Sequence, residues 1–296
     1  AYWSNTKDLL LNRTIPTING TSSLLENIGE TANNGVEFQL TSTNINKKDF
    51  NWTTTFTLSH YNTKIKDVGI YDENGKPIDD VASRWFIGQP VNVNYGYVFD
   101  GIWQITDPTN PNGQQDPDIM YSIPGYVKYK DIDGKKGITT DDREIIGRCI
   151  PDFTAGLSNT FTYKDFSLSF FLNGQVGATA RNYLWDVNGI SYTQNKMMIE
   201  FWTPENPINT YPKNMLSSVD PHGAGFYEKT DFLRLQDVTL SYRLPQTLLK
   251  KVDINRLEVF MNIKNLATWT SWTGLDPEYI GNQHATPAVR SFILGF

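Results

Sequence analysis

The chain has 296 residues, of which 20% are charged and 13% are aromatic, and its formal net charge is −6. This negative charge argues against a nucleic-acid partner, because nucleic-acid binding requires a basic face. Cys149 is the only cysteine, which excludes a disulfide framework and a thiolate metal cluster. No apolar run approaches the ~18 residues of a membrane-spanning helix. The first residues, AYWSNTKDLL, read as an internal stretch, so we expect the chain to be part of a longer protein.

The main local signal is an alternation of apolar and polar residues with a period of two, which is typical of β-strands. In FSLSFFLNGQ, for example, Phe166, Leu168 and Phe170 alternate with polar residues, and Phe171 is out of phase. In chain order, the alternating segments are residues 34–45, 51–64, 153–163, 166–177, 229–243, 256–266 and 292–296. The pattern therefore predicts an all-β fold.

The polar faces of these predicted strands separate two kinds of β-protein. Residues 51–62, 153–163 and 166–177 contain Ser, Thr, Asn and Gln, but no Lys, Arg, Asp or Glu. A soluble sandwich normally exposes Lys and Glu on its wet face. An apolar face toward lipid and a neutral polar face toward a wet lumen is the pattern of a transmembrane β-barrel. We favour the barrel and keep the sandwich as the alternative.

The connections between the predicted strands alternate in length. Residues 46–49 and 164–165 form tight links, and PQTLLKK at 245–251 predicts a short turn with some helical character. The long connections are residues 65–152, 178–228 and 267–288. Outer-membrane barrels have short periplasmic turns and long extracellular loops. Counting from the tight links places all three long connections on the same, outer side.

Aromatic residues are frequent in the long connections, namely Trp85, Tyr95, Tyr97, Trp103, Trp185, Trp202, Trp269 and Trp272. Long structureless loops are usually functional. We predict Trp85, Trp103 and Trp185 as substrate-binding residues, with packing inside the loops as the alternative. Near the strand ends, we assign the aromatic girdles of the membrane interfaces to Trp52, Tyr61, Tyr163 and Tyr242.

The stretch YKDIDGKKGITTDDREIIG resembles a twelve-residue calcium loop. Asp131, Asp133 and Asp142 occupy its first, third and twelfth places, but Lys135 stands where the fifth ligand belongs. An ammonium group there repels a cation. We therefore predict no tightly bound metal, and expect Lys135 or Lys136 to turn inward onto Asp131 or Asp142.

The sequence contains none of the usual catalytic or cofactor motifs: no GxSxG, HExxH, P-loop or GxGxxG. His60, His222 and His284 are far apart in the chain. Paired carboxylates of a glycoside hydrolase are not recognisable among 32 acidic residues. The sequence therefore predicts that the chain is not an enzyme and has no cofactor.

Several longer stretches carry a resemblance to a known family. They are NNGVEFQL (33–40), IGQP (87–90), YGYVFDGIWQ (95–104), PGYVKYKDIDG…ITTDDREIIG (124–147), PDFTAGLSNTFTYKDFSLSFFLNGQ (151–175), DFLRLQDVTLSYRLP (231–245) and LEVFMNIKNLATWTSWTGLDPE (257–278). In this order, and over nearly the whole chain, they resemble the SusC/RagA-like TonB-dependent outer-membrane transporters of Bacteroidetes-type bacteria.

The resemblance is to the C-terminal third of such a transporter. It implies that residues 1–296 form an antiparallel portion of about eight strands of a ~22-stranded transmembrane β-barrel, without the plug and N-terminal domains. It also implies a place in the bacterial outer membrane and import of an oligosaccharide or an oligopeptide.

The implied partners are a SusD-like lipoprotein lid, the remaining segment of the same transporter, TonB through the missing N-terminal part, and outer-membrane lipid. We expect the outer loops, residues 65–152 and 178–228, to contact the lid, the substrate or both. A secreted β-rich carbohydrate-binding module is the alternative function, because the loop aromatics would also suit it.

Overall fold

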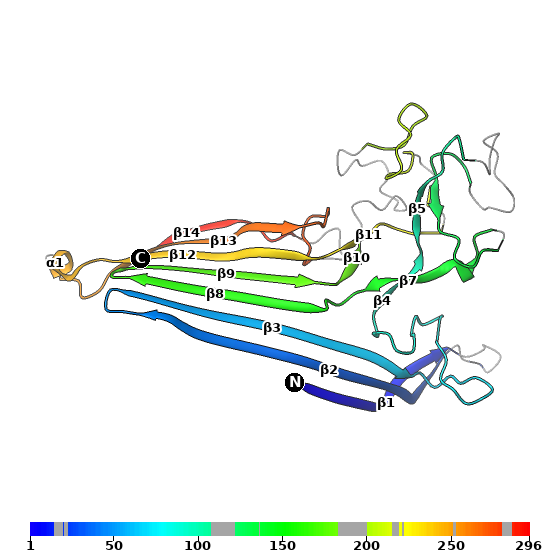
Figure 1. Ribbon diagram of the computed structural model, residues 1–296, viewed down its shortest axis with the longest axis horizontal. Coiled ribbons are helices and arrows are strands. Elements are labelled where there is room, and N and C mark those ends of the chain that lie inside the picture. Colours follow the sequence, from blue (N-terminus) through cyan, green and yellow to red (C-terminus); the bar gives the residue numbers. More distant parts are fainter. Residues whose placement is uncertain are drawn as a thin grey trace.

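The structure is a computed structural model of the chain. It describes all residues except 15–19, 21–22, 108–121, 136, 183–199, 215–218, 221, 251–252 and 280–285. Figure 1 shows one long sheet that carries short connections at one end and long connections at the other. We call these the turn end (residues 47–49, 164–165 and 244–257) and the loop end, which holds the first (68–152), second (177–231) and third (271–290) long loops. No helix in the described ranges has the length and apolar character needed to cross a membrane.

The main sheet has eight strands, each antiparallel to its neighbours. Their order is β1 (Tyr2–Thr14), β2 (Ser23–Asn46), β3 (Phe50–Asp67), β8 (Phe153–Tyr163), β9 (Phe166–Val176), β12 (Phe232–Arg243), β13 (Glu258–Thr270) and β14 (Ser291–Gly295). Strands β1 and β14 are the two edges of this sheet. The predicted all-β, antiparallel fold is confirmed.

Two strands differ from the sequence prediction. Strand β1 was not predicted, and β2 begins at Ser23 rather than near residue 34. The pairing of β1 with β2 shifts register between Thr6 and Leu9, and Asp8 has a positive φ of 57°. Such a bulge breaks the alternation of side chains between the two faces, so β1 shows no period of two.

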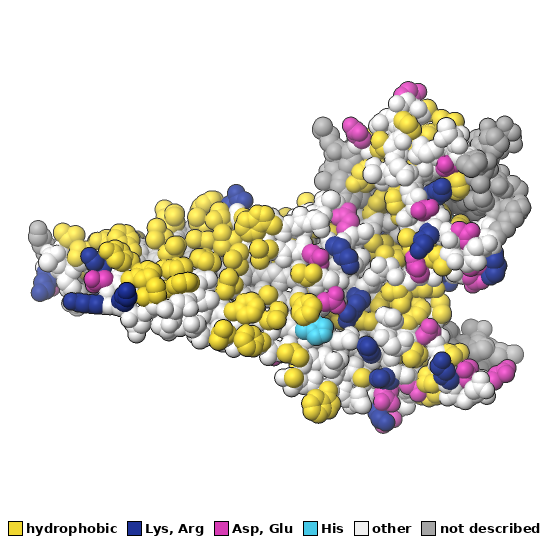
Figure 2. All heavy atoms as spheres, in the orientation of Figure 1, with side chains coloured by type: hydrophobic (Ala, Val, Ile, Leu, Met, Phe, Trp, Pro, Cys, Tyr) yellow, Lys and Arg dark blue, Asp and Glu magenta, His cyan; other side chains and the backbone are white. Residues whose placement is uncertain are grey.

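Cross-strand pairing brings the predicted apolar residues onto one face of the sheet. Leu157 pairs with Phe56 and Leu172, and Leu240 pairs with Leu168 and Met261. We call this face the apolar band; it comprises Val36, Phe38, Leu40, Phe56, Leu58, Leu157, Phe161, Leu168, Phe170, Leu172, Val238, Leu240, Met261, Ile263, Phe292 and Leu294. Figure 2 shows hydrophobic side chains gathered along the sheet between its two ends.

The opposite face of the sheet, the polar face, carries mainly hydroxyl and amide side chains. Thr41 and Thr55 lie opposite each other there, with their Oγ1 atoms 3.2 Å apart. Phe171, the residue that is out of phase, also lies on this face, beside Gly156. A Cβ atom on Gly156 would come within 3.2 Å of the Phe171 ring, so the glycine leaves room for it.

The predicted aromatic girdle is divided between the two faces. Tyr163 pairs with Phe166 and Phe166 with Tyr242, so these three rings lie together at the turn end of the apolar band. Tyr61 pairs with Gly35 and therefore lies on the polar face, so the girdle assignment is wrong for this residue. Pairing partners always share a face, and a position near a strand end does not determine which one.

The long loops contain secondary structure of their own. Three two-stranded sheets pair β4 (Val93–Tyr97) with β7 (Arg143–Arg148), β5 (Phe99–Ile102) with β6 (Val127–Tyr129), and β10 (Thr179–Arg181) with β11 (Tyr227–Lys229). The 3-10 helix η2 (Thr140–Asp142) precedes β7, and α1 (Gln246–Leu249) lies at the turn end, where helical character was predicted. Most buried apolar side chains also lie at the loop end, so the hydrophobic core of this chain is in its loops.

Candidate ligand-binding surface at the loop end

A hydrophobic cluster joins the first and second long loops. Ile102, Val127 and Tyr129 come from the first loop, and Trp202 and Ala224 come from the second. Each of the five is at most 5% exposed. Side chains packed in this way restrict one another's movement. The two loops therefore form one packed unit (Figure 1).

The buried carboxylate of Asp220 in the second loop also binds the first loop through Tyr129. Asp220 Oδ1 accepts hydrogen bonds from the Tyr129 hydroxyl (2.7 Å) and the backbone N–H of Ala224 (2.9 Å), and its Oδ2 accepts one from Gly225 (3.0 Å). The backbone N–H of His222 donates to the Tyr129 oxygen. Burial lowers the pKa of His222, against an opposing effect of Asp220, so its imidazole is neutral at pH 7.

The third long loop is held against the polar face by a buried arginine of β12. Arg234 is 3% exposed, and its Nη2 lies 2.7 Å from Asp276 Oδ1. Its Nη1 bonds Glu278, and its Nε donates to Thr268 Oγ1 at 3.0 Å. Burial acts to raise the pKa of Asp276, but the backbone N–H of Glu278 and the Arg234 guanidinium outweigh it, so the pKa is lowered. This carboxylate is therefore ionised and paired.

A second link joins the third loop to the second. Glu228 of β11 accepts hydrogen bonds from the backbone N–H (2.9 Å) and the hydroxyl (2.7 Å) of Thr273. Asn182 donates to both of these side chains. All three long loops are thus connected by buried or partly buried contacts. The arrangement suits a preformed surface that holds a ligand or a second protein without first having to fold.

The three predicted substrate-binding tryptophans have different surroundings. Trp103 is 8% exposed and packs with Tyr126 and Val219, and the Lys128 ammonium lies 4.9 Å from its ring centre. It is therefore a packing residue of the loop core. Trp85 is partly exposed and belongs to neither hydrophobic cluster of the described residues. Trp185 lies outside the described residues. The substrate role of all three stays a prediction.

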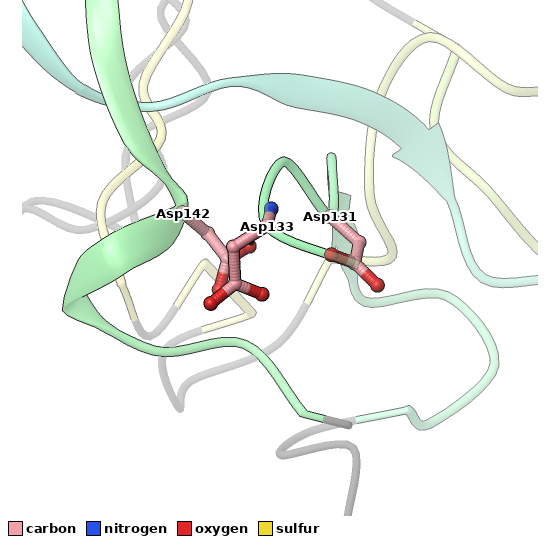
Figure 3. A group of neighbouring side chains, drawn as sticks. All are labelled: Asp131, Asp133 and Asp142. Carbon is pink, nitrogen blue, oxygen red and sulfur yellow. Dashed lines mark hydrogen bonds between the residues drawn. The ribbon is translucent and has the colours of Figure 1, made fainter. Parts of the chain in front are cut away.

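The acidic group of the calcium-like loop lies between β6 and β7 (Figure 3). Oxygen atoms of Asp131, Asp133 and Asp142 all lie within 4.8 Å of one another. Asp142 is fully buried and accepts hydrogen bonds from the backbone N–H groups of Ile132 (2.9 Å) and Thr139 (2.7 Å). Burial acts to raise the pKa of Asp142, but these and other backbone donors outweigh it and lower the pKa below 3.8.

The neighbouring lysine contacts different carboxylates from those we expected. Lys135 Nζ lies 2.8 Å from Asp133 Oδ2 and 3.7 Å from Asp141 Oδ2, and so does not bond Asp131 or Asp142. Lys136 lies outside the described residues. The hydrogen bond from Lys135 lowers the pKa of Asp133. Gly134 and Gly137, with φ of 68° and 86°, form the turn on either side of Lys135.

Carboxylate oxygens of the calcium-like loop therefore already accept hydrogen bonds from within the loop. Asp131 Oδ1 accepts from the backbone N–H of Gly134 at 2.7 Å, and Ile138 packs against the hydrophobic cluster of Ile102 and Val127. Donors that point at a carboxylate compete with a cation for the same lone pairs. The absence of a tightly bound metal ion stays a prediction; among the described residues, Asp131, Asp133 and Asp142 are the one group of three or more acidic, histidine or cysteine side chains placed to hold an ion.

Among the described residues, Cys149 and the histidines have separate surroundings. Burial raises the pKa of the Cys149 thiol, whose Sγ lies 3.5 Å from Asn94 Oδ1. The His60 Nδ1 atom lies 2.6 Å from the carbonyl oxygen of Asp152, on the main sheet. Within the described part of the chain, no hydrogen bond joins Cys149 to a histidine. His284 lies outside the described residues.

The residues that join the loops to one another and to the sheet belong to no motif of the sequence. Arg234 did carry one signal, because it is a charge on the polar face of a strand whose neighbours there are mostly neutral. Its partners Asp276 and Glu278 lie in the third long loop. No local pattern pointed to them, or to the pairing of Tyr129 with Asp220.

Comparison with known sequences identifies proteins that are similar along this chain. No protein-family model matches. The chain is 32% identical over 288 residues to TonB-dependent receptor P26 and 31% identical over 317 residues to TonB-dependent receptor P3, both of Formosa agariphila. It is 25% identical over 305 residues to TonB-dependent receptor SusC of Bacteroides thetaiotaomicron. These alignments cover 94%, 99% and 99% of this chain, but only 28%, 31% and 29% of the relatives, so the chain spans under a third of their length.

Solved structures show the same fold. The RagAB peptide importer in its open-open state superposes with a TM-score of 0.68 at 25% identity, over 95% of this chain and 30% of that chain. A structure of the RagAB peptide transporter superposes with a TM-score of 0.70 at 24% identity, over 99% of this chain and 32% of that chain.

Proposed function

We propose that this chain, a SusC-like segment of a TonB-dependent receptor of the bacterial outer membrane, forms the C-terminal part of the β-barrel of a nutrient importer. The imported nutrient in this proposal is a bulky one, an oligosaccharide or an oligopeptide. The observation that carries the proposal is a single sheet with one apolar and one polar face, whose long loops all lie at one end.

The apolar band supports a membrane-spanning sheet. Phe38 and Leu40 are 49% and 53% exposed, and Leu294 is 79% exposed. In a soluble carbohydrate-binding module, a second layer would cover such a face. None of the described residues forms such a layer over this band. Lipid is the surrounding that makes this face stable, so we prefer the barrel to the binding module.

The two sheet edges, β1 and β14, support incorporation into a larger barrel. Each pairs on one side only within the described part of the chain. Unpaired backbone groups are costly in hydrocarbon, where no water replaces the missing hydrogen bonds. We propose that strands from the remaining segment of the same transporter complete a ~22-stranded barrel around a plug. TonB would act through the N-terminal part.

The loop end supports a role in binding. The three long loops form one connected unit through the cluster at Val127, the pair Tyr129–Asp220 and the hydrogen bonds between Glu228 and Thr273. In this proposal, the unit seats a SusD-like surface lipoprotein and lines the entry of the substrate. The similar proteins carry the names of receptors and importers, so we place the chain in the same, non-enzymatic class.

Growth on defined nutrients tests this function. A strain that lacks the full-length receptor should fail to grow on one class of bulky nutrient, either glycan or peptide, as sole source. Growth on the corresponding monomers should be normal, because these do not need the importer. Unchanged growth on both classes would contradict the proposal.

Complementation tests the part played by Trp85. A receptor with Trp85→Ala should restore uptake two- to tenfold less well than wild type, because a ring contact is worth about 0.5–1.5 kcal/mol. The matched variant Trp85→Phe keeps an aromatic face and should restore most of the uptake. Equal uptake by both variants would remove Trp85 from the substrate path.

A further inference from the structure

The three turns at the turn end form one continuous rim. The backbone N–H of Lys164 donates to the carbonyl oxygen of Asp49 at 2.9 Å, which joins the first two turns. The backbone N–H of Arg243 donates to the carbonyl oxygen of Asp165 at 2.9 Å, which joins the second turn to the third. Charges on the three turns therefore lie side by side.

The rim has an excess of positive charge. We include Arg243, the last residue of β12, and Glu258, the first residue of β13, because both adjoin the third turn. The described cations of the rim are then Lys47, Lys48, Lys164, Arg243, Lys250 and Arg256, and its described anions are Asp49, Asp165, Asp253 and Glu258. Six cations minus four anions leave a charge of +2, whereas the whole chain has −6. All six cations are exposed, and within the described residues only Arg256 forms an ion pair, with Glu258 at 3.1 Å.

Aromatic rings lie between these cations and the apolar band. The rings of Phe166 and Tyr242 stack with their centres 4.4 Å apart, and Tyr163 is paired with Phe166. The Lys164 ammonium lies 5.5 Å from the centre of the Tyr163 ring, and so on the side of the apolar band. Figure 2 shows basic side chains at the narrow end of the molecule, next to the hydrophobic surface.

We propose that this basic rim binds the phosphate groups of anionic phospholipids in the membrane leaflet on the turn side. The inference rests on the proposed function, which places lipid against the apolar band and the turns at the periplasmic surface. Aromatic rings mark the level of the headgroups. Long cationic side chains reach that level with their stems along apolar surface, and each is attracted to an anionic leaflet. Acyl chains of the same lipids lie along the apolar band.

Lipid binding by the purified full-length receptor tests the inference. In neutral detergent, native mass spectrometry should show more bound phosphatidylglycerol than phosphatidylcholine at equal concentration. The triple variant Lys47→Gln, Lys48→Gln, Lys164→Gln should lose phosphatidylglycerol affinity, about fivefold for each cation removed. The corresponding Lys→Arg triple keeps the charge and should retain binding, which separates a lost charge from a damaged fold.

A matched variant removes three exposed lysines from the other half of the molecule. Lys64→Gln, Lys66→Gln, Lys76→Gln changes net charge equally, and should leave phosphatidylglycerol binding within twofold of wild type. Equal loss in both Gln triples, or no preference for phosphatidylglycerol in the wild type, would overturn the inference.

The side of the membrane on which the turns lie can be tested separately from lipid binding. An epitope inserted between Lys47 and Lys48 should be reached by antibody only after the outer membrane is permeabilised. Access in intact cells would contradict the orientation, and with it both proposals. Periplasmic turns without a lipid preference would overturn only the lipid inference.

Discussion

Apolar side chains are exposed in the strands of the main sheet but buried at the loop end. In the strands, apolar side chains recur with a period of two and stay exposed, as at Val36 (53%). At the loop end they follow no period and are buried, as at Val127 (1%). A sheet surrounded by lipid needs no second layer over its apolar face, whereas loops in water must bury their own apolar side chains. The difference shows which solvent each half of the chain meets.

Charged residues also differ between the central strands β8 and β9 and the loop end. The polar faces of β8 and β9 have no charged side chain. At the loop end, Asp220 and Asp142 are buried and accept several hydrogen bonds, and Asp276 is buried against Arg234 of β12. A wide polar lumen leaves side chains hydrated, so they need no partners. A packed loop core removes water, and each buried charge there requires its own partner.

The largest expected effect comes from the ion pair that joins the two regions. Arg234→Met leaves Asp276 buried without its partner and should cost about 3–5 kcal/mol of local stability. Hydrogen exchange of residues 271–279 and 286–290 in the full-length receptor should accelerate, while β8 and β9 stay protected. The double variant Arg234→Met, Asp276→Leu removes both charges and should recover most of the protection. Unchanged exchange in the single variant would show that the ion pair does not anchor the third loop.

A charge on each face of one strand tests the assignment of the two faces. Leu157 lies in the apolar band and Ser158 lies on the polar face, midway along β8. Leu157→Arg should destabilise the assembled receptor by about 2–4 kcal/mol, the cost of Arg at the lipid midplane. Ser158→Arg should assemble almost normally, because its side chain meets water. Urea unfolding in lipid bilayers measures both, and equal costs would remove the distinction between the faces.

Matched Val→Ala changes compare the packing of the two regions. Val127→Ala removes buried methyl groups from the loop core and should cost about 2 kcal/mol. Val36→Ala removes the same groups from the apolar band, where lipid fills the space, and should cost under about 0.5 kcal/mol. Proteolysis of the loops and urea unfolding of the barrel report the two effects. A larger cost at Val36 would contradict a lipid-facing position.

The buried carboxylate of the calcium-like loop predicts a pH dependence. Asp142→Asn weakens the acceptors of the Ile132 and Thr139 N–H groups and should cost about 1–2 kcal/mol locally, whereas the exposed neighbour Asp141→Asn should cost less. Because the folded pKa of Asp142 is lowered from 3.8, its stabilisation is present above pH 3.8 and is lost as pH falls through the lowered value. Loop protection in wild type and Asp142→Asn should therefore converge in strong acid. A difference that persists there would contradict this assignment.

The smallest expected effect is the response of this loop to calcium. Millimolar Ca²⁺ or its removal by chelator should leave hydrogen exchange of residues 130–143 unchanged. Lys135 and backbone N–H groups already donate hydrogen bonds to the carboxylates. Lys135→Asn removes the ammonium and offers an oxygen at the fifth ligand place, so Ca²⁺ affinity should rise at least about tenfold. Tight Ca²⁺ binding by the wild type would show the prediction of no metal to be wrong.

The sequence by itself predicted most strands of the main sheet and placed the three long connections at the same end. Strand β8 was predicted with its observed bounds, 153–163, and β9 within one residue, because a period of two is a purely local property. The same locality explains the failures. A bulge near Asp8 hides β1, and the short strands of the loops, such as β5 and β6, do not contain enough residues to show a period.

Only the tertiary structure decided how the loop end is built. Asp131, Asp133 and Asp142 were recognisable in the sequence because one local loop holds all three. The pairing of Arg234 with Asp276 joins residues that are far apart in the chain, and no spacing rule predicts such a contact. Trp103 reads in sequence as a loop aromatic open to ligand, yet it is buried in the loop core. Burial depends on what the rest of the chain places around a residue, and for that reason it was decided by packing alone.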